Sequence, residues 1–407
     1  MNPPFSHSRM ISWMIWTIAS VFYAYQYILR VMPNIMLNDI MQQFHIDTAT
    51  FGQFSGVYYI GYSLLHLPVG ILLDRFGPKK IMSGCILLTV LGLSPLLFAT
   101  HWIYPIIGRF LIGLGSSAAI LGVFKIIRMA FKEEQFPRML SISVTIGLIG
   151  AIYGGGPVHY MRETMGYEAV IYVFAGMGIA LALATFLLIP SLSSKPERTV
   201  FSDIKEVLSN GRVIGSCIFA GMMVGPLEGF ADVWGTVFLK VGYQMDGSVA
   251  ASLPSMIYIG MCFGSPILSF VADKMGSYLL TIIGAGIIMT TSFVLMLTMP
   301  LGAAVLTVSF ICIGISSAYQ ILAIYKASTY VREQVAGLTT AMANMIIMIF
   351  GYVFHTLMGT IIKAMGGQAE ASALFSGVWV IPVALSIGSL GFIFLFLQEK
   401  ALQKQKV

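Results

Sequence analysis

Long apolar stretches, separated by short polar segments, fill almost the whole chain and decide what it can fold into. Only 10% of the residues are charged, whereas a soluble domain carries about 25%. Most stretches reach the ~20 residues with which an α-helix crosses a hydrocarbon core of about 30 Å. We therefore predict an all-α membrane protein with twelve transmembrane helices. The expected spans are 10–37, 49–73, 80–99, 102–129, 138–160, 168–190, 213–239, 250–272, 278–298, 303–328, 336–362 and 372–397.

A dense polar turn separates the second and third spans. Residues 70–80 read Gly-Ile-Leu-Leu-Asp-Arg-Phe-Gly-Pro-Lys-Lys. Gly77 offers the positive φ that ends a helix, and Pro78 prevents its continuation. Seven positions of this turn resemble the signature between helices 2 and 3 of the major facilitator superfamily of secondary transporters; the alternative is an ordinary basic loop of another membrane protein. The resemblance implies two pseudo-symmetric six-helix halves that transport by alternating access, with the substrate site at mid-membrane.

The two halves of the chain repeat one another, which indicates a duplication. Three short matches share an offset of 199 or 200 residues: Asp-Arg-Phe-Gly at 74–77 with Asp-Lys-Met-Gly at 273–276, Ser-Ser-Ala at 116–118 with 316–318, and Glu-Gln at 134–135 with 333–334. We expect an N-terminal half at 1–190, a cytoplasmic linker at 191–212 and a C-terminal half at 213–407. Within the linker, Phe201, Ile204 and Leu208 recur at helical spacing and predict a short amphipathic helix on the membrane surface.

The basic residues predict the orientation of the spans. Eighteen Lys and Arg fall in the segments on the side of the termini, and three fall in the opposite loops, namely Arg162, Lys240 and Lys363. By the positive-inside rule, both termini are cytoplasmic, and we expect a multi-pass protein of the cell inner membrane. No small-residue cleavage site follows the first span, which predicts an uncleaved helix. The four cysteines lie in apolar runs without metal-ligand spacing.

Charged side chains inside spans are costly, so each is a candidate functional group. In the first span, Tyr23, Tyr27 and Arg30 share one helical face, and Gln26 lies beside them. A guanidinium flanked by phenols suits a carboxylate, which it can bind through two hydrogen bonds. We therefore expect these four residues to bind substrate. The alternative is an arginine that is permanently paired with an acid of the protein.

The seventh span carries two acids, Glu228 and Asp232, at i and i+4 on one helical face. A carboxylate in a low-dielectric site can hold a proton at neutral pH, and glycines and a proline nearby favour a bent helix. We predict that one of the pair couples transport to protons or binds a substrate amine, and that Trp234 contacts substrate. The alternative is a structural ion pair, such as Asp232 with Arg30 or Arg109.

Further candidates come from the resemblance. Arg109, followed by Gly113 and Gly115, is similar to the fourth-helix motif that the superfamily ties to proton coupling; the alternative is that the small residues allow close helix packing. The resemblance also implies a set of gating residues at the cytoplasmic turns, which are Asp74, Arg75, Arg128, Asp273 and Lys274. We expect Arg128 to pair with Asp74. Lys125 and Lys326 are expected to extend to the membrane surface.

Three polar side chains at mid-span depth, Tyr58, Gln320 and His355, are further expected substrate contacts. A lone buried histidine is more often a packed helix contact, which is the alternative for His355. The glycine-proline segment at 150–157 resembles the motif of superfamily antiporters, but Val158 and His159 replace its usual glycines. We therefore expect packing and hinge roles there and do not infer antiport.

These patterns predict a proton-coupled importer of a small zwitterionic or anionic solute, such as an amino acid, short peptide or organic acid. The first two spans resemble those of phagosomal-type amino-acid and dipeptide-type transporters. The main alternative is a proton-driven exporter of drugs or siderophores, which the Met- and Phe-rich spans favour; a second is a receptor without flux. We expect a monomer in the lipid bilayer, with no enzymatic activity, cofactor, metal or nucleic-acid partner.

Overall fold

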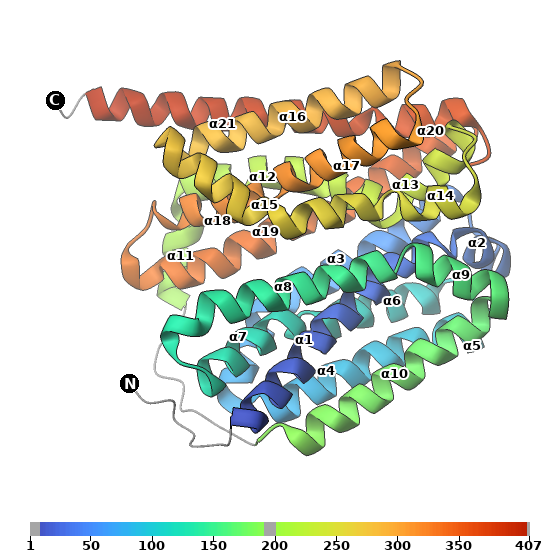
Figure 1. The fold of residues 1–407 in the computed structure, drawn as a ribbon, viewed down its shortest axis with the longest axis horizontal. Coiled ribbons are helices and arrows are strands. Elements are labelled where there is room, and N and C mark those ends of the chain that lie inside the picture. Colours follow the sequence, from blue (N-terminus) through green and yellow to red (C-terminus); the bar gives the residue numbers. More distant parts are fainter. Residues whose placement is uncertain (1–8, 191–200, 405–407) are drawn as a thin grey trace. The chain divides into compact units, whose positions relative to one another are not determined.

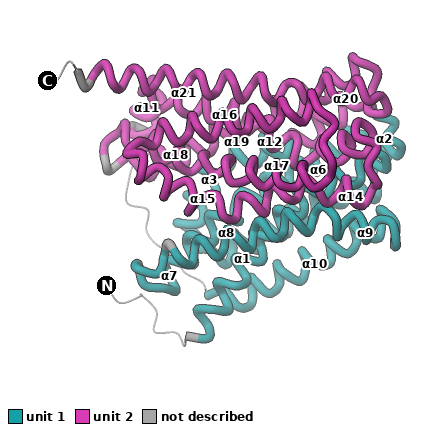
Figure 2. The backbone as a smooth tube through the Cα atoms, turned by 45° about the horizontal axis from the view of Figure 1, so that its top comes forward, with its two compact units in different colours: residues 1–46, 57–197 teal, residues 47–56, 198–407 magenta. Residues whose placement is uncertain are grey.

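The computed structural model describes residues 9–190 and 201–404 and forms two compact units (Figures 1 and 2). Unit 1 comprises residues 1–46 and 57–197, and unit 2 comprises residues 47–56 and 198–407. Helix α3, Thr48–Phe76, therefore contributes its first residues to unit 2 and the remainder to unit 1. The expected linker helix lies in unit 2 as α11, Phe201–Ser209, and residues 191–200 of that linker are outside the described part.

Every regular element in the described residues is helical, as the sequence predicts. Unit 1 contains α1 Arg9–Val31, η1 Met32–Asn34, α2 Leu37–Phe44, α4 Pro78–Leu93, α5 Pro95–Phe98, α6 Ile103–Ser116, α7 Ala118–Ala130, η2 Glu133–Gln135, α8 Phe136–Tyr153, α9 Gly156–Met165 and α10 Tyr167–Leu188. Unit 2 contains α11, α12 Gly211–Gly229, η3 Phe230–Trp234, α13 Gly235–Val237, η4 Phe238–Gly242, α14 Gly247–Ser252, α15 Ser255–Met275, α16 Tyr278–Thr298, α17 Ala303–Ser317, α18 Tyr319–Ser328, α19 Glu333–Ala364, α20 Ala371–Val378 and α21 Val380–Lys404.

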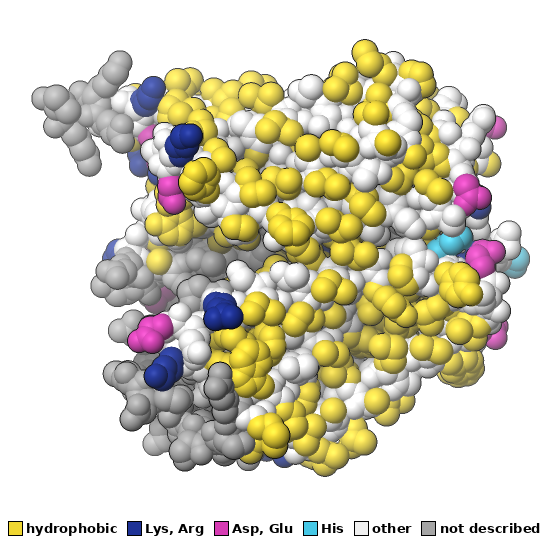
Figure 3. All heavy atoms as spheres, in the orientation of Figure 1, with side chains coloured by type: hydrophobic (Ala, Val, Ile, Leu, Met, Phe, Trp, Pro, Cys, Tyr) yellow, Lys and Arg dark blue, Asp and Glu magenta, His cyan; other side chains and the backbone are white. Residues whose placement is uncertain are grey.

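Eleven helical segments of the described chain are long and apolar enough to cross a membrane, and α1, of 23 residues, is the remaining long helix. Large apolar side chains on these helices are exposed, for example Leu183 and Phe394. In each unit they cover the middle of the helices, and charged side chains gather at the helix ends (Figure 3). An exposed apolar middle is what a helix in contact with lipid requires, so the prediction of an all-α, twelve-helix membrane fold is confirmed.

The sequence repeat is also a structural repeat. The polar turn at 70–80 ends α3 at Gly77 with a φ of 81°, and its counterpart ends α15 at Gly276 with a φ of 62°. Both values lie in the left-handed region that favours glycine. The duplicated Ser-Ser-Ala segment marks a second shared feature: it interrupts one span between α6 and α7 and the other between α17 and α18.

Each unit contains a close crossing of two of its own helices, and the two crossings are built in the same way. A Cβ added at Gly113 of α6 would lie 2.0 Å from the carbonyl oxygen of Tyr58 in α3. A Cβ added at Gly314 of α17 would lie 2.0 Å from the carbonyl oxygen of Ile257 in α15. Backbones approach this closely only where one partner lacks a side chain. The crossing in unit 1 fixes the position of the backbone at Tyr58, and the crossing in unit 2 fixes the position of the backbone at Ile257, next to Tyr258.

Candidate functional site

The polar face of α1 forms a buried cluster in unit 1. The guanidinium carbon of Arg30 lies 4.8 Å from the ring centre of Tyr27 and 5.5 Å from that of Tyr59. The ring of Tyr23 lies edge-on to that of Tyr27, with 5.2 Å between centres. Arg30 is only 6% exposed. The predicted face therefore exists, and electron-rich ring faces favour the arginine cation there.

Helix α3 places a second row of aromatic side chains against this cluster. The hydroxyl of Tyr58 donates a 2.6 Å hydrogen bond to Oε1 of Gln26, and both side chains are buried. The ring of Tyr58 stacks on Tyr62, whose ring lies 5.2 Å from that of His66. Because these three residues are spaced by four, they form one stripe along α3. The sequence interpretation singled out Tyr58 from this stripe and gave no role to Tyr62.

Arg109 has a clear structural contact that its motif does not predict. Its Nη1 and Nη2 donate hydrogen bonds of 2.6 and 2.7 Å to the carbonyl oxygens of Leu29 and Arg30. In a regular helix the carbonyl of Leu29 would accept from the N–H of residue 33, but Pro33 has no N–H. Arg109 thus satisfies backbone acceptors at the end of α1, next to Arg30, and its guanidinium lies 4.9 Å from the ring centre of Tyr58.

The acids of the seventh span lie in an irregular helix of unit 2. Asp232 is fully buried within η3, a π-helical turn that follows directly on α12. The hydroxyl of Tyr258, on α15, donates a hydrogen bond to Oδ1 of Asp232. Glu228 lies in the last turn of α12 and is 8% exposed. A second π-helical turn, η4, follows at Phe238–Gly242; such turns are rare and are frequent at functional sites.

A small cavity next to Glu228 is lined by both polar and apolar side chains. Its polar lining consists of Glu228, Tyr258, Ser317 and Gln320, and its volume is about 20 Å³, which is room for about one water molecule. Nε2 of Gln320 lies 3.4 Å from Oδ1 of Asn344. Tyr258 thus lines the same cavity as Glu228 and also donates a hydrogen bond to Asp232.

Trp234 and His355 are buried elsewhere in unit 2. The indole of Trp234 is fully buried with its ring 6.3 Å from that of Phe51, and none of the described residues hydrogen-bonds its Nε1. Nδ1 of His355 lies 3.2 Å from the carbonyl oxygen of Gly351, one turn earlier in α19. Neither Trp234 nor His355 is among the described residues that line the small cavity.

The expected gating residues lie at the helix ends. Oδ1 of Asp74 is 2.8 Å from Nζ of Lys125, and the guanidinium carbon of Arg128, which we expected to pair with Asp74, lies 5.5 Å from the ring centre of Phe136. Lys125 thus does more than extend to the surface. Lys326 likewise forms a 2.8 Å ion pair, with Glu399. The other three expected gating residues, Arg75, Asp273 and Lys274, are exposed.

Tyr258 is the main residue that the sequence interpretation missed, although the repeat contains a signal for it. Tyr-Ile-Gly at 59–61 recurs as Tyr-Ile-Gly at 258–260, an offset of 199. The first tyrosine of this pair contacts Arg30, and the second contacts Asp232. The duplicated tyrosine therefore marks the buried charge in both units.

Comparisons with known proteins agree with this architecture. Residues 10–354 match the model of the Major Facilitator Superfamily. The chloramphenicol resistance protein CraA of Acinetobacter baumannii is 22% identical over 72% of each chain. The putative metabolite transport protein NicT of Pseudomonas putida is 22% identical over 44% of this chain and 43% of its own. A crystal structure of the nucleoside transporter NupG superposes with a TM-score of 0.79 at 15% identity, over 94% of this chain and 100% of that one.

Proposed function

Because the chain belongs to the major facilitator superfamily, it is a multi-pass membrane protein of secondary transport, and we propose that it couples uptake of a small zwitterionic or anionic solute to protons. The observation that carries the proposal is the pairing of each buried charge with a tyrosine. Arg30 lies beside Tyr27 and Tyr59, and Asp232 accepts a hydrogen bond from Tyr258. Charges at membrane depth are retained where they act on a substrate or an ion.

In this proposal, Arg30 binds the substrate carboxylate, because its planar guanidinium can donate two parallel hydrogen bonds. Glu228 binds the substrate amine or takes the proton, since it is the acid that adjoins a cavity. Asp232 is the second proton-carrying group, and Tyr258 holds its carboxylate in place. The remaining proposed substrate contacts are Tyr23, Gln26, Tyr27, Tyr58, Trp234, Gln320 and His355, and Arg109 is kept as a proton-coupling candidate.

The same proposal covers orientation and gating. We propose that both termini are cytoplasmic, because eighteen Lys and Arg fall in the segments and span ends on that side, against three in the opposite loops. We place the protein in the inner membrane as a monomer. The set Asp74, Arg75, Arg128, Asp273 and Lys274 is proposed to gate the cytoplasmic side, and Lys125 joins this set because it pairs with Asp74.

Proteoliposome flux tests the proposal. The purified protein is reconstituted and given an outside-acid pH gradient, with labelled alanine, alanyl-alanine and succinate as probes. Uptake above the equilibrium level, abolished by a protonophore, is the expected result. Arg30→Ala should weaken uptake of the active probe at least about tenfold, because hydrogen bonds to a charged group are lost. Lys240→Ala, which removes an exposed positive charge from the turn η4, should leave uptake unchanged.

Two conservative variants test the role of each acid in proton coupling. Asp232→Asn and Glu228→Gln keep shape but cannot release a proton. At least one of them should retain exchange of labelled for unlabelled substrate and lose uphill accumulation. If both variants still accumulate substrate against its gradient, proton coupling through this pair is wrong. A conserved circular-dichroism spectrum and melting temperature would show that either loss is not caused by misfolding.

A drug exporter is the second candidate, and the similarity to a chloramphenicol resistance protein favours it. The same vesicles distinguish the two functions. Chloramphenicol accumulating inside vesicles that are acidic within, by exchange for protons, would support export. Solute accumulating under the opposite gradient supports import.

A further inference from the structure

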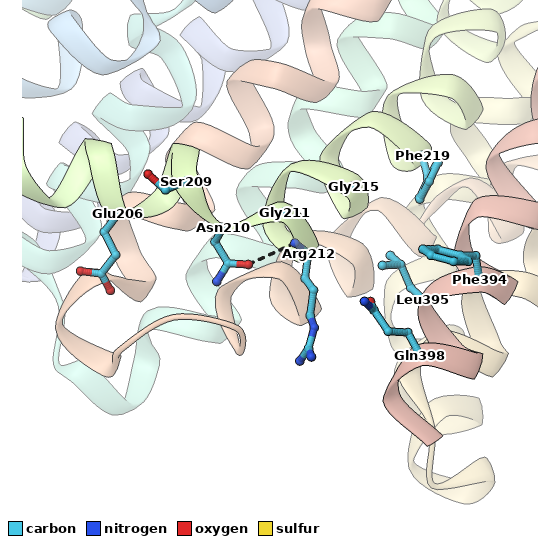
Figure 4. Close-up of a pocket in the computed structure, with 10 residues that line it drawn as sticks. All are labelled: Glu206, Ser209, Asn210, Gly211, Arg212, Gly215, Phe219, Phe394, Leu395 and Gln398. Atoms are coloured by element: carbon cyan, nitrogen blue, oxygen red, sulfur yellow. Dashed lines mark hydrogen bonds between the residues drawn. The ribbon is translucent and has the colours of Figure 1, made fainter. Parts of the chain in front are cut away.

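An open pocket lies at one end of unit 2, away from the buried charges described above. It is formed by α11, the start of α12 and the end of α21 (Figure 4). Its volume is about 840 Å³, within the range of small-molecule sites. The described lining residues are Glu206, Ser209, Asn210, Gly211, Arg212, Gly215, Phe219, Phe394, Leu395 and Gln398. None of them belongs to the proposed transport site.

The pocket lies at the boundary between the membrane-spanning and the polar parts of unit 2. The apolar span that contains α12 begins at Gly211, and the span that contains α21 ends at Leu402. The pocket is therefore lined by the first residues of one span and the last turns of the other. Phe394 is 61% exposed on the apolar surface of α21, so this side of the pocket opens toward lipid. Its polar side carries Asn210, Arg212 and Gln398.

The charge of the pocket comes from Arg212. None of the described carboxylates lies within ion-pair distance of Arg212, whose guanidinium carbon is 5.8 Å from the ring centre of Tyr330. Among the described lining residues, Glu206 is the one acid, and Arg332 engages it through hydrogen bonds of 2.6 to 3.1 Å. The positive charge at the pocket is thus available, whereas the negative charge is compensated. Figure 4 shows the Arg212 side chain between Asn210 and Gln398.

The apolar side of the pocket can take a hydrocarbon chain. Phe219, Phe394 and Leu395 form this wall, and Gly215 leaves space next to it. A Cβ added at Gly215 would find its nearest atoms at 3.7 and 3.9 Å, on Phe219 and Leu395, which is ordinary contact. A larger side chain at this position would therefore enter the pocket without displacing backbone.

We propose that this pocket binds the headgroup of an anionic phospholipid. Arg212 pairs with the phosphate through a charge-assisted hydrogen bond, Gln398 contacts the polar part of the headgroup, and an acyl chain lies along Phe219 and Phe394. Asn210 positions Arg212, because its Oδ1 accepts hydrogen bonds from the backbone N–H groups of Arg212 and Val213 at the start of α12. A basic side chain and an apolar wall at the membrane boundary match both ends of such a lipid. The inference does not depend on the transported substrate.

Native mass spectrometry of the delipidated full-length protein tests it, with phosphatidylglycerol and phosphatidylcholine as probes. We expect the wild type to retain phosphatidylglycerol, and Arg212→Gln to bind it about tenfold more weakly. Gly215→Leu should weaken binding as well, because it fills the apolar side. Lys205→Gln is the matched control, since it removes an exposed positive charge of α11 outside the pocket.

Three outcomes would overturn the proposal. The first is phosphatidylglycerol binding that survives in both Arg212→Gln and Gly215→Leu. The second is an equal loss in Lys205→Gln, which would mean unspecific attraction between charges. The third is full competition by glycerol phosphate at matched concentration, which would identify a soluble phosphate ester as the ligand. Melting curves of all variants in detergent exclude misfolding as the cause of any loss.

Discussion

The helices that carry the buried charges, α1 in unit 1 and α12 in unit 2, leave α-helical geometry in opposite ways. After Arg30, α1 tightens into the 3-10 turn η1, and the acceptors freed there bind Arg109. At Asp232, the seventh span widens into the π-helical turn η3. Duplication kept the supporting tyrosine and the glycine crossing in both units, but the buried charge is positive in one and negative in the other. The scaffold is shared, whereas the irregular turn and the charge are particular to each unit.

The largest effect should come from the shared crossing. Gly113→Ala and Gly314→Ala each place a Cβ 2.0 Å from a backbone oxygen, so the helices must separate. We expect each variant to lose about 3 kcal/mol of unfolding free energy, the upper part of the range for overpacking. Chemical denaturation in detergent measures this. Gly84→Ala and Gly284→Ala, which meet nothing within 4 Å, are the controls. A loss at only one crossing would contradict the equivalence of the two units.

The next effect concerns Arg109 and the end of α1. Arg109→Gln should cost about 2 kcal/mol, because two charge-assisted hydrogen bonds to buried carbonyls are lost. In a Pro33→Ala background the cost should fall by about 1 kcal/mol, since residue 33 regains the N–H that can bond to Leu29. The double-mutant cycle is measured by unfolding and by uptake. Strictly additive effects would show that Arg109 does not act through the acceptors that Pro33 frees.

A smaller difference is expected between the two lysine ion pairs. Lys326 and Glu399 have 19% and 24% exposed side chains, whereas Lys125 and Asp74 have 25% and 62%. We expect Lys326→Ala to cost about 1 kcal/mol and Lys125→Ala about 0.3 kcal/mol, because exposed pairs are screened by water. Both costs should shrink in 1 M salt. An equal or reversed order would mean that burial does not decide the strength of these pairs.

The smallest effect is expected at the opposite helix ends, where Lys363 pairs with Asp47 at 2.6 Å. Partial burial raises the pKa of Asp47, but hydrogen bonds from Lys363 and Thr50 outweigh it and lower the pKa overall. The stabilisation is therefore complete above the unfolded pKa of about 3.9 and is lost as the pH falls through the lower folded value. Since the Lys363 and Asp47 side chains are 55% and 43% exposed, the effect should lie at the lower end of the about 0.2–1 kcal/mol of exposed pairs.

Comparing unfolding of the wild type and Asp47→Asn between pH 7 and pH 3 measures this contribution. The difference between the two proteins should be constant near neutral pH and should narrow in acid. A difference that grows on acidification would show that the pKa of Asp47 is not lowered by Lys363.

Much of the fold could be predicted because lipid imposes few solutions on a chain. The length of the apolar stretches, Gly77 and the repeated Ser-Ser-Ala segment each correspond to a helix, a helix end or a helix break. The cluster of Arg30 with Tyr23 and Tyr27 could be predicted for the same reason, since it lies within one regular helix.

Other features depend on contacts that periodicity does not contain. Asp74 pairs with Lys125, which lies one turn before Arg128 in α7, and helical periodicity alone does not decide which of two basic residues on neighbouring turns reaches an acid of another helix. Arg109 contacts backbone carbonyls, which every residue has, so the sequence does not show which of them it binds. In the π-helical turn at Asp232, backbone N–H groups donate to the carbonyl five residues earlier instead of four. Residues such as Phe230 also occur in α-helices and do not predict this change.

The two π-helical turns of the seventh span give it a mechanical property of its own. A π turn is an α-helix with one residue in excess, and exchanging hydrogen bonds one at a time can carry that excess along the helix. Each exchange swaps one carbonyl partner for its neighbour, so no backbone group needs to face lipid unsatisfied. We expect such an exchange to turn the side chains between Phe230 and Gly242 about the helix axis.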